Sequence, residues 1–226
     1  MSRAGLARRI AWVALTTAAL FAMLTVWIVW APNQLLPADA FLHRWSVEHR
    51  PAALVAGARA LTDTGTGVIP YALLLLAGLY AGRTIRQRAW TAAALMLCLG
   101  AGQALRYMTM TLIARARPPV EDWAAQASGW SFPSGHSTTG AMTAGLLVAA
   151  LLLRGDRTPP RTLVVLIGLW GAVVGLTRVY LGVHWFTDVI GGWLFATAWL
   201  SLPACAYLRR TGDRPTGDRP SGGRLT

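Results

Sequence analysis

The chain contains no lysine and only two cysteines, and acidic residues are scarce, at nine among 226. Charged residues make up 13% of the sequence, against about 25% in an ordinary soluble domain. Hydrophobic residues reach 54%, which excludes such a domain and indicates a polytopic membrane protein. Cys98 and Cys205 lie inside apolar runs, where we expect packing residues, so they say little about redox chemistry.

Six apolar runs with little or no charge are each long enough to cross a membrane. A bilayer core of about 30 Å requires roughly 17 to 25 helical residues. We therefore predict an all-α bundle of six transmembrane helices. The runs are 10–31, 64–82, 89–105, 137–153, 162–177 and 189–208.

The arginines orient this predicted bundle. Fourteen of them fall on one side and seven on the other, and the positive-inside rule then places both termini in the cytoplasm of a cell-membrane protein. The net charge of +12 is explained by this topology and by anionic lipid headgroups, so no nucleic-acid partner is expected. The majority side holds Arg3, Arg8, Arg9, Arg83, Arg86, Arg88, Arg154, Arg157, Arg161, Arg209, Arg210, Arg214, Arg219 and Arg224; the outer side holds Arg44, Arg50, Arg59, Arg106, Arg115, Arg117 and Arg178.

Residues 1–208 are predicted to form one membrane domain, and 209–226 a disordered cytoplasmic tail. The tail repeats Thr-Gly-Asp-Arg-Pro, which is typical of low-complexity sequence. The arginines before the first run also resemble the charged start of a signal peptide. The length of that run and its aromatic edge at Trp27 and Trp30 favour a retained anchor.

Between the first two runs, residues 38–49 predict an amphipathic helix at the outer interface. Phe41, Leu42 and Trp45 share one side of it. We expect this helix to act as scaffold, with His43 and His49 solvated or interfacial rather than catalytic.

Arg115 and Arg117 end the third predicted span. Pro118 disfavours helical geometry at Arg117, so both guanidinium groups are expected in the outer loop. Arginine presents a planar fork of donors that suits phosphate oxygens. For Arg115 alone, snorkelling at the interface is an equally good interpretation.

A second motif, Pro133-Ser134-Gly135-His136, predicts a helix entry with Ser134 near the N-cap. Free backbone N–H groups at such a terminus bind anions, and Gly135 lets a phosphate approach closely. His136 in the first turn has the chemistry of a general acid. Alone, the tetrapeptide is a weak signal, since a capping turn with an incidental histidine reads the same way.

The third motif runs from Arg178 through His184 to Asp188. Gly182 permits a tight turn, so Arg178 closes one helix and His184 opens the next. Asp188 lies four residues after His184 and therefore on the same helix face. A carboxylate there can hold one imidazole nitrogen and leave the other as a nucleophile. Asp188 could alternatively serve only the helix N-terminus.

Taken together, these residues resemble the type 2 phosphatidic acid phosphatase superfamily of lipid phosphatases, whose pattern reads K-x6-R-P, P-S-G-H and S-R-x5-H-x3-D. The resemblance implies a phosphatase that needs no metal or other cofactor and works through a phosphohistidine. It assigns the nucleophile to His184, its orientation to Asp188 and leaving-group protonation to His136. Phosphate binding falls by the same resemblance to Arg117, Arg178 and the backbone of Ser134 and Gly135.

Two positions depart from the family pattern. Thr177 replaces the serine and keeps a hydroxyl, whereas Met110 stands at the lysine position and cannot bind phosphate. The missing cation is expected from Arg115, or from Arg106 one helical turn before Met110.

The sequence therefore predicts a membrane lipid phosphatase with its site at the outer membrane–water interface. Undecaprenyl diphosphate is the first candidate substrate, followed by phosphatidate and phosphatidylglycerophosphate. Two alternatives stay open, which are phosphoryl transfer to an acceptor other than water and non-catalytic lipid-phosphate binding or transport. Membrane lipids are the expected surroundings, and the sequence names no protein partner.

Overall fold

The computed structural model describes residues 2–31, 34–155 and 158–212. Within these ranges the chain is helical, with no strand. It contains eight α-helices and one short 3-10 helix: α1 (Arg3–Trp30), α2 (Pro37–Glu48), α3 (Ala52–Asp63), α4 (Val68–Ala81), α5 (Ile85–Ile113), η1 (Val120–Asp122), α6 (Gly135–Arg154), α7 (Arg161–Tyr180) and α8 (Phe186–Gly212).

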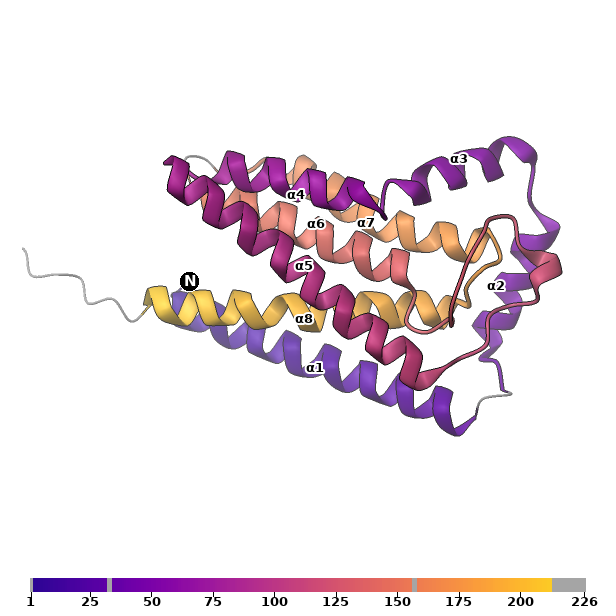
Figure 1. Ribbon diagram of the computed structural model, residues 1–226. Helices are drawn as coiled ribbons and strands as arrows, with labels where there is room; N and C mark the ends of the chain where they lie inside the picture. The colour runs from indigo at the N-terminus through magenta and orange to yellow at the C-terminus, as the bar shows by residue number, and fades with distance from the viewer. Residues whose placement is uncertain (1, 32–33, 156–157, 213–226) are drawn as a thin grey trace, which may run out of the picture.

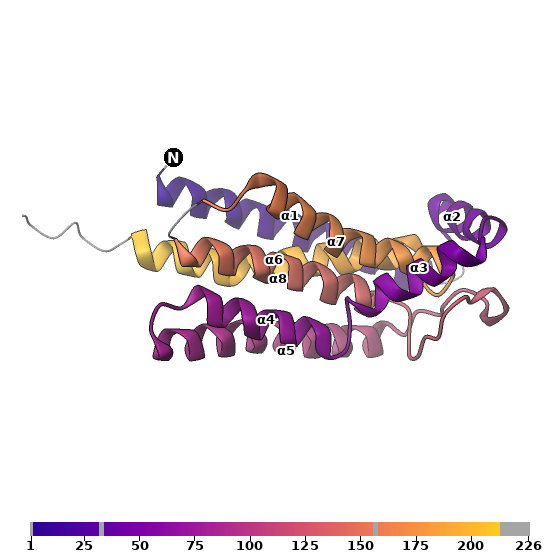
Figure 2. The same cartoon turned by 90° about the horizontal axis from the view of Figure 1, so that it is seen from above.

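The long helices run roughly side by side and form an elongated bundle, with α2 lying across one end (Figures 1 and 2). Helix α1 packs along α8, and α6 contacts α4, α5, α7 and α8. An apolar core lies between α4, α5, α6 and α8, where Leu74, Leu99 and Met142 are fully buried. Helix α6 is therefore the central element of the bundle.

Four helices, α1, α6, α7 and α8, have the length and apolar composition of membrane spans. The bent pair α3–α4, which turns by 51° at its break, would make a fifth. Helix α5 is 29 residues long and includes the predicted run 89–105, but Gln103 and Arg106 interrupt its apolar sequence. The structure thus supports four or five candidate spans, where the sequence predicted six.

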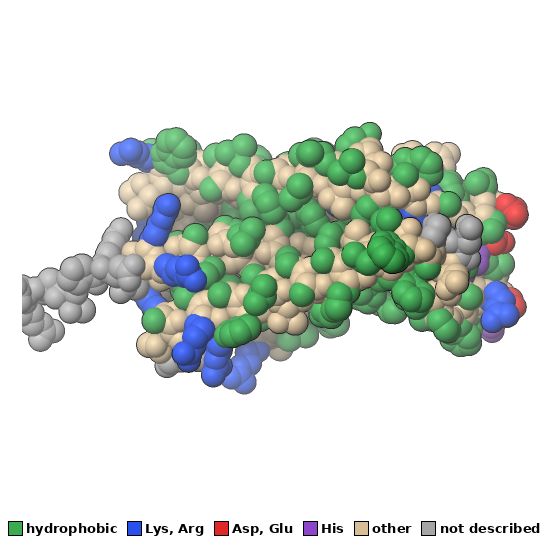
Figure 3. Space-filling view, turned by 90° about the horizontal axis from the view of Figure 1, so that it is seen from below, with side chains coloured by type: hydrophobic (Ala, Val, Ile, Leu, Met, Phe, Trp, Pro, Cys, Tyr) green, Lys and Arg blue, Asp and Glu red, His purple; other side chains and the backbone are tan. Residues whose placement is uncertain are grey.

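Much of the apolar surface points outward, as expected of a protein in lipid. Leu15 and Met23 on α1 are each 60% exposed. Figure 3 shows hydrophobic side chains covering the flank of the bundle, while most visible arginines gather at the end where α1 begins and α8 ends. The opposite end, which we call the distal end, carries the visible acidic and histidine side chains.

Helix α2 differs from its prediction in the face that it buries. Phe41 and Trp45 are exposed, as expected of an interfacial helix. The buried face, however, is polar and consists of Asp39, His43 and Ser46. His43 was expected to be solvated or interfacial, which is wrong, because it is 9% exposed and its Nε2 lies 2.9 Å from Asp122 Oδ2.

Helix α8 continues past residue 208 to Gly212, so the first four residues of the predicted tail are helical. The remainder of that tail, 213–226, lies outside the described residues.

Candidate active site

The three sequence motifs meet at the distal end of the bundle. Helix α5 ends at Ala114, which has a left-handed conformation (φ 50°), and the chain then passes through Arg115 and Arg117. Ser134 is the N-cap of α6, and Gly182 (φ 70°) makes the turn between α7 and α8. Loops therefore carry the nucleophile candidate and two arginines, and helix ends hold the other predicted residues except Arg106, which lies inside α5.

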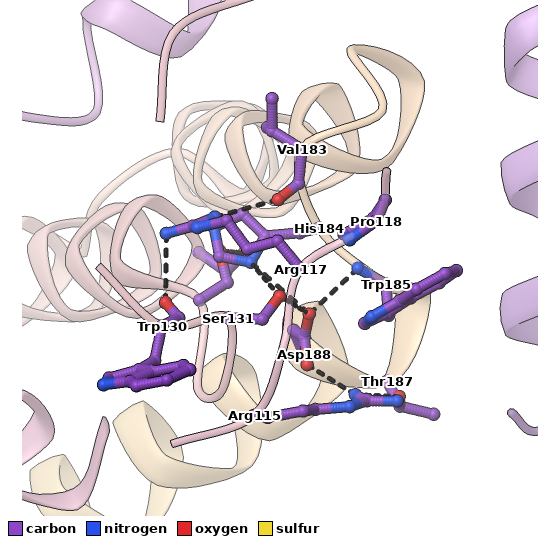
Figure 4. Close-up of polar contacts among 12 residues, drawn as sticks. Arg115, Arg117, Pro118, Trp130, Ser131, Val183, His184, Trp185, Thr187 and Asp188 are labelled. Carbon is purple, nitrogen blue, oxygen red and sulfur yellow. Dashed lines mark hydrogen bonds and ion pairs between the residues drawn. The ribbon is translucent and has the colours of Figure 1, made fainter. Parts of the chain in front are cut away.

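His184 is buried, at 2% exposure, and its two ring nitrogens meet different partners (Figure 4). Nε2 lies 2.9 Å from Arg117 Nη1. Arginine has no acceptor, so this bond requires an unprotonated Nε2 and places the ring proton on Nδ1. Burial lowers the pKa of His184 to about 4, and the charge of Arg117 acts in the same direction. At pH 7 the imidazole is therefore neutral, with its Nε2 lone pair toward Arg117.

The Nδ1 side of His184 is closed by Asp188 and Ser131. Nδ1 lies 3.4 Å from Asp188 Oδ2 and 3.3 Å from Ser131 Oγ. The same carboxylate oxygen accepts hydrogen bonds from the Ser131 hydroxyl and from the Trp185 N–H, the latter at 2.9 Å. Asp188 is fully buried, and these donors fix its orientation toward the imidazole.

Arg117 has all five of its N–H donors engaged. Nε and Nη2 donate to the carbonyl groups of Gly129, Ser128 and Trp130, at 2.7 to 3.0 Å. Nη1 donates to the Val183 carbonyl at 2.8 Å and to His184. Arg117 thus ties the loop before α6 to the loop before α8, and only its bond to Nε2 faces the reactive atom.

Arg115 lies on the other side of Asp188, away from the imidazole (Figure 4). Its Nη1 donates to Asp188 Oδ1 at 2.5 Å and to Thr187 Oγ1 at 2.7 Å. Its Nη2 donates to Asp39 Oδ2 on α2, at 2.9 Å. The Arg115 guanidinium, which was expected to bind phosphate, is therefore bonded to two carboxylates, those of Asp188 and Asp39.

Arg106 lies beside the Pro-Ser-Gly-His segment. A Cβ built on Gly135 would be 3.4 Å from Arg106 Cζ and Nη1, so the guanidinium packs against the bare backbone of α6. Its hydrogen bond within the described chain goes from Nη1 to the sulfur of Met110, at 3.1 Å. Sulfur is a weak acceptor, so the guanidinium retains donors for an anion.

Arg178 and His136 line one cavity of about 530 Å³ at the distal end, together with Arg59, Thr62, Asp63 and residues 123–126. The Arg178 hydrogen bonds to Thr62 Oγ1 and to the Gln126 carbonyl are both long, at 3.4 Å. Its Nε is buried without a partner among the described residues. The cavity thus brings a histidine and an unsatisfied guanidinium to one space.

The start of α6 matches its prediction in part. Ser134 is the N-cap, but its N–H donates to the Asp188 carbonyl at 3.0 Å and its hydroxyl accepts from Ser137 at 2.9 Å. The first N–H of α6 itself is that of Gly135. The backbone donors that remain for an anion therefore begin at Gly135, next to Arg106.

Sequence reasoning missed three side chains of this network: Ser131, Asp39 and Thr187. Ser131 stands two residues before the Pro-Ser-Gly-His motif, which could have signalled it. Thr177, the conservative replacement in the third motif, donates its hydroxyl to the Val174 carbonyl within α7 at 2.6 Å.

In the described part of the chain, no group of three or more His, Cys, Asp or Glu side chains is arranged to hold a metal ion. Instead, Arg117 contacts Nε2 of His184, and the charge of Arg178 also acts on this imidazole. A neutral, oriented imidazole beside guanidinium groups and a helix N-terminus can attack a phosphorus atom whose oxygens those groups bind.

Several proteins of known activity resemble this chain. Phosphatidylglycerophosphatase B of Bacillus subtilis is 28% identical over 71% of this chain and 78% of its own. Lipid A 1-phosphatase of Rhizobium etli is 31% identical over 72% and 75%. Undecaprenyl-diphosphatase of Sulfolobus acidocaldarius is 41% identical over a shorter stretch, 32% of this chain and 31% of its own.

The crystal structure of a transmembrane PAP2-type phosphatidylglycerolphosphate phosphatase from Bacillus subtilis superposes with a TM-score of 0.69. It is 25% identical and covers 88% of this chain and 96% of its own. The model of the PAP2 superfamily matches residues 64–211, which include all three motifs of the site. On this evidence the chain is a multi-pass membrane protein that belongs to the PAP2 superfamily.

Proposed function

We propose that this chain is a metal-independent lipid phosphatase that works through a phosphohistidine on His184. The observation that carries the proposal is the orientation of the His184 ring, with Nδ1 facing Asp188 and Nε2 facing a guanidinium, which assigns the ring proton to Nδ1 and the lone pair to Nε2. A lipid-binding protein has no need of an oriented nucleophile.

The reaction proceeds in two displacements. The negative charge of the bound phosphate keeps His136 protonated. His184 Nε2 attacks phosphorus, the bond to the leaving oxygen breaks, and His136 gives that oxygen its proton. Water then attacks the phosphohistidine, and His136 accepts a proton from that water. Inorganic phosphate leaves, His184 returns to its neutral form, and His136 is protonated again. Asp188 stabilises the imidazolium character that develops on Nδ1 in the first step.

The phosphate oxygens are held mainly by Arg106, Arg178 and the Gly135 N–H. These two guanidinium groups retain donors, whereas Arg117 can offer only the Nη1 hydrogen that now meets Nε2. Arg106 packs against Gly135 and touches Met110, so it stands in for the lysine of the family pattern. Arg115 supports Asp188 instead.

The substrate is a lipid phosphate, and its leaving group enters the cavity beside His136. Phosphatidylglycerophosphate and undecaprenyl diphosphate are the first two to test. The first is part of the name of a relative that matches most of this chain, and the second is part of the name of a relative that matches a shorter stretch at higher identity. Phosphatidate and lipid A 1-phosphate complete the set.

In the proposed topology the chain crosses the plasma membrane six times, with α3–α4 and α5 as the second and third spans. Both termini are cytoplasmic and the distal end faces outside. Single cysteines at Val120 and Thr158, in a background with Cys98 and Cys205 replaced, test this. An impermeant maleimide on intact cells should label position 120 and spare 158; the reverse pattern contradicts the topology.

The functional test is phosphate release from the four lipids in detergent by the purified protein and by its His184→Ala variant. We expect release that requires His184, survives EDTA and is inhibited by orthovanadate, which adopts five-coordinate geometry. Release by His184→Ala at the wild-type rate would refute the nucleophile, and loss in EDTA that Mg²⁺ restores would refute metal independence.

A further inference from the structure

Asp39 on α2 is a buried carboxylate that the reaction outlined above does not use. It is 1% exposed, and both of its oxygens are bonded to the segment that carries Asp188. Oδ1 accepts the Thr187 N–H at 2.8 Å, and Oδ2 accepts the Thr187 hydroxyl at 2.6 Å. Oδ2 also accepts from Arg115 Nη2 at 2.9 Å.

These bonds form a closed ring of Arg115, Asp39 and Thr187, to which Asp188 is joined through Arg115. Arg115 lies between the two carboxylates, with Nη2 on Asp39 and Nη1 on Asp188 Oδ1. Thr187 donates its hydroxyl to Asp39 and accepts from Arg115 Nη1. Asp188 Oδ1 accepts the hydrogen bond from Arg115, and Asp188 Oδ2 faces Nδ1 of His184.

Asp39 also completes the N-terminus of α8. The first N–H groups of a helix have no partner inside it, and Thr187 lies in the first turn. Asp39 supplies the acceptor for that N–H from a different helix, and its negative charge suits the positive end of the helix dipole. The backbone on which Asp188 stands is thereby fixed to α2.

Charge gives the ring a second role. Arg115 shares its positive charge between two buried carboxylates, so Asp188 is only partly neutralised by it. With Asp39 uncharged, Arg115 would be attracted by Asp188 alone. That would draw electron density away from Oδ2 and make Asp188 a poorer partner for the His184 imidazolium.

We propose that Asp39 is a positioning residue of the phosphatase reaction, acting on Asp188 through Arg115 and Thr187 without touching the substrate. This inference rests on the proposed function of His184. It assigns the buried polar face of α2 to catalysis, where the sequence predicted a scaffold.

A matched control separates positioning from simple docking of α2. Asp122 holds the same face of α2 through His43, at 2.9 Å, but has no contact with Asp188. Asp122→Asn therefore removes a carboxylate that docks α2 and leaves the ring of Arg115, Asp39 and Thr187 intact. Thr187→Val is a milder second probe, because it removes the hydroxyl between Arg115 and Asp39 and keeps the side-chain shape.

The experiment measures kcat and KM for phosphate release by the full-length protein in detergent. We expect Asp39→Asn to lower kcat by about 10- to 100-fold and Thr187→Val by about 3- to 10-fold, each with KM within twofold. Asp122→Asn should stay within twofold in both. If Asp39→Asn does not fold, Thr187→Val decides: an unchanged kcat overturns the proposal.

A double-mutant cycle adds a result that a structural role would not give. If Asp39 acts through Asp188, then adding Asp39→Asn to Asp188→Asn should cost less than about threefold. A full additional loss, or a KM effect in place of the kcat effect, overturns the positioning role and leaves the His184 chemistry standing. Absence of any His184-dependent release overturns both.

Discussion

The two sides of the His184 ring are built in opposite ways. On the Nδ1 side, every polar group is paired: Asp188 accepts from Ser131, Trp185 and Arg115, and Arg115 donates further to Thr187 and Asp39. Nε2 faces Arg117, and the other cations near it and His136 have donors left over, including the partnerless Nε of Arg178 and most of the Arg106 fork.

This difference separates two tasks that charged residues perform in one site. A saturated network holds its members in one geometry, which suits the group that orients the nucleophile. Unsatisfied donors beside a cavity are unfavourable unless an anion completes them, which suits substrate binding. Variants on the saturated side should therefore lower kcat, and variants on the unsatisfied side should act on binding of both the substrate and the transition state.

The largest effect is expected from His184 and Asp188 themselves. His184→Ala removes the nucleophile and should leave no measurable turnover. Asp188→Asn keeps a hydrogen-bonding shape but loses the charge that stabilises the imidazolium, so a residual rate, down by about 10³- to 10⁴-fold, should remain. Single-turnover phosphate release measures both, and equal rates for the two variants would contradict their different roles.

Arg178→Ala and Arg106→Ala should come next, because each removes charge-assisted bonds to phosphate. Such bonds contribute about 1.5 to 3 kcal/mol, or roughly 10- to 150-fold in kcat/KM. Adding Met110→Lys should restore much of the activity of Arg106→Ala and little of that of Arg178→Ala. If the lysine rescues neither variant, Arg106 is not the substitute cation.

Arg115→Ala should behave differently from Arg106→Ala. It leaves two buried carboxylates with no cation between them, so it should lower kcat and thermal stability together. Met110→Lys should not rescue it, because Met110 contacts Arg106 rather than Arg115. Rescue of Arg115→Ala by that lysine would mean that Arg115 binds phosphate after all.

The smallest effect is expected from Ser131→Ala, which tests the fully hydrogen-bonded Nδ1 side of His184. Ser131→Ala removes one hydrogen bond to Asp188, while Trp185 N–H and Arg115 remain. A net loss of about 1 kcal/mol predicts a kcat roughly fivefold lower at unchanged KM. A KM effect alone would move Ser131 to the substrate side of the ring.

The sequence was sufficient where spacing decides geometry. Asp188 follows His184 by four residues, and the two side chains meet as predicted, although His184 lies in the turn before α8 and does not open the helix; Gly182 makes that turn. Positions 133–136 form the helix entry that Pro-Ser-Gly-His predicted. These features depend on one or two turns of local structure.

The sequence could not decide which way side chains turn or which distant segments meet. The sequence left Arg115 and Arg106 as equal candidates for the missing cation. In the structure α5 ends at the left-handed Ala114, and beyond this turn Arg115 contacts Asp188, whereas Arg106 packs against Gly135. Asp39 and Thr187 are 148 residues apart, and no periodicity links them. The run 64–82 likewise yields only the 14-residue helix α4, because the chain bends by 51° between α3 and α4, and nothing in the sequence predicted that α3 precedes this bend.

Trapping the covalent intermediate tests the central claim most directly. Wild-type protein is mixed with a lipid phosphate labelled at the reactive phosphorus, quenched within milliseconds in alkaline denaturant, and digested for mass spectrometry. We predict label on the peptide that contains His184, stable in base and lost in acid, absent from His184→Ala and longer-lived in a variant with His136→Ala. Phosphate release at the wild-type rate with no label on His184, or with label on another residue, would contradict the account.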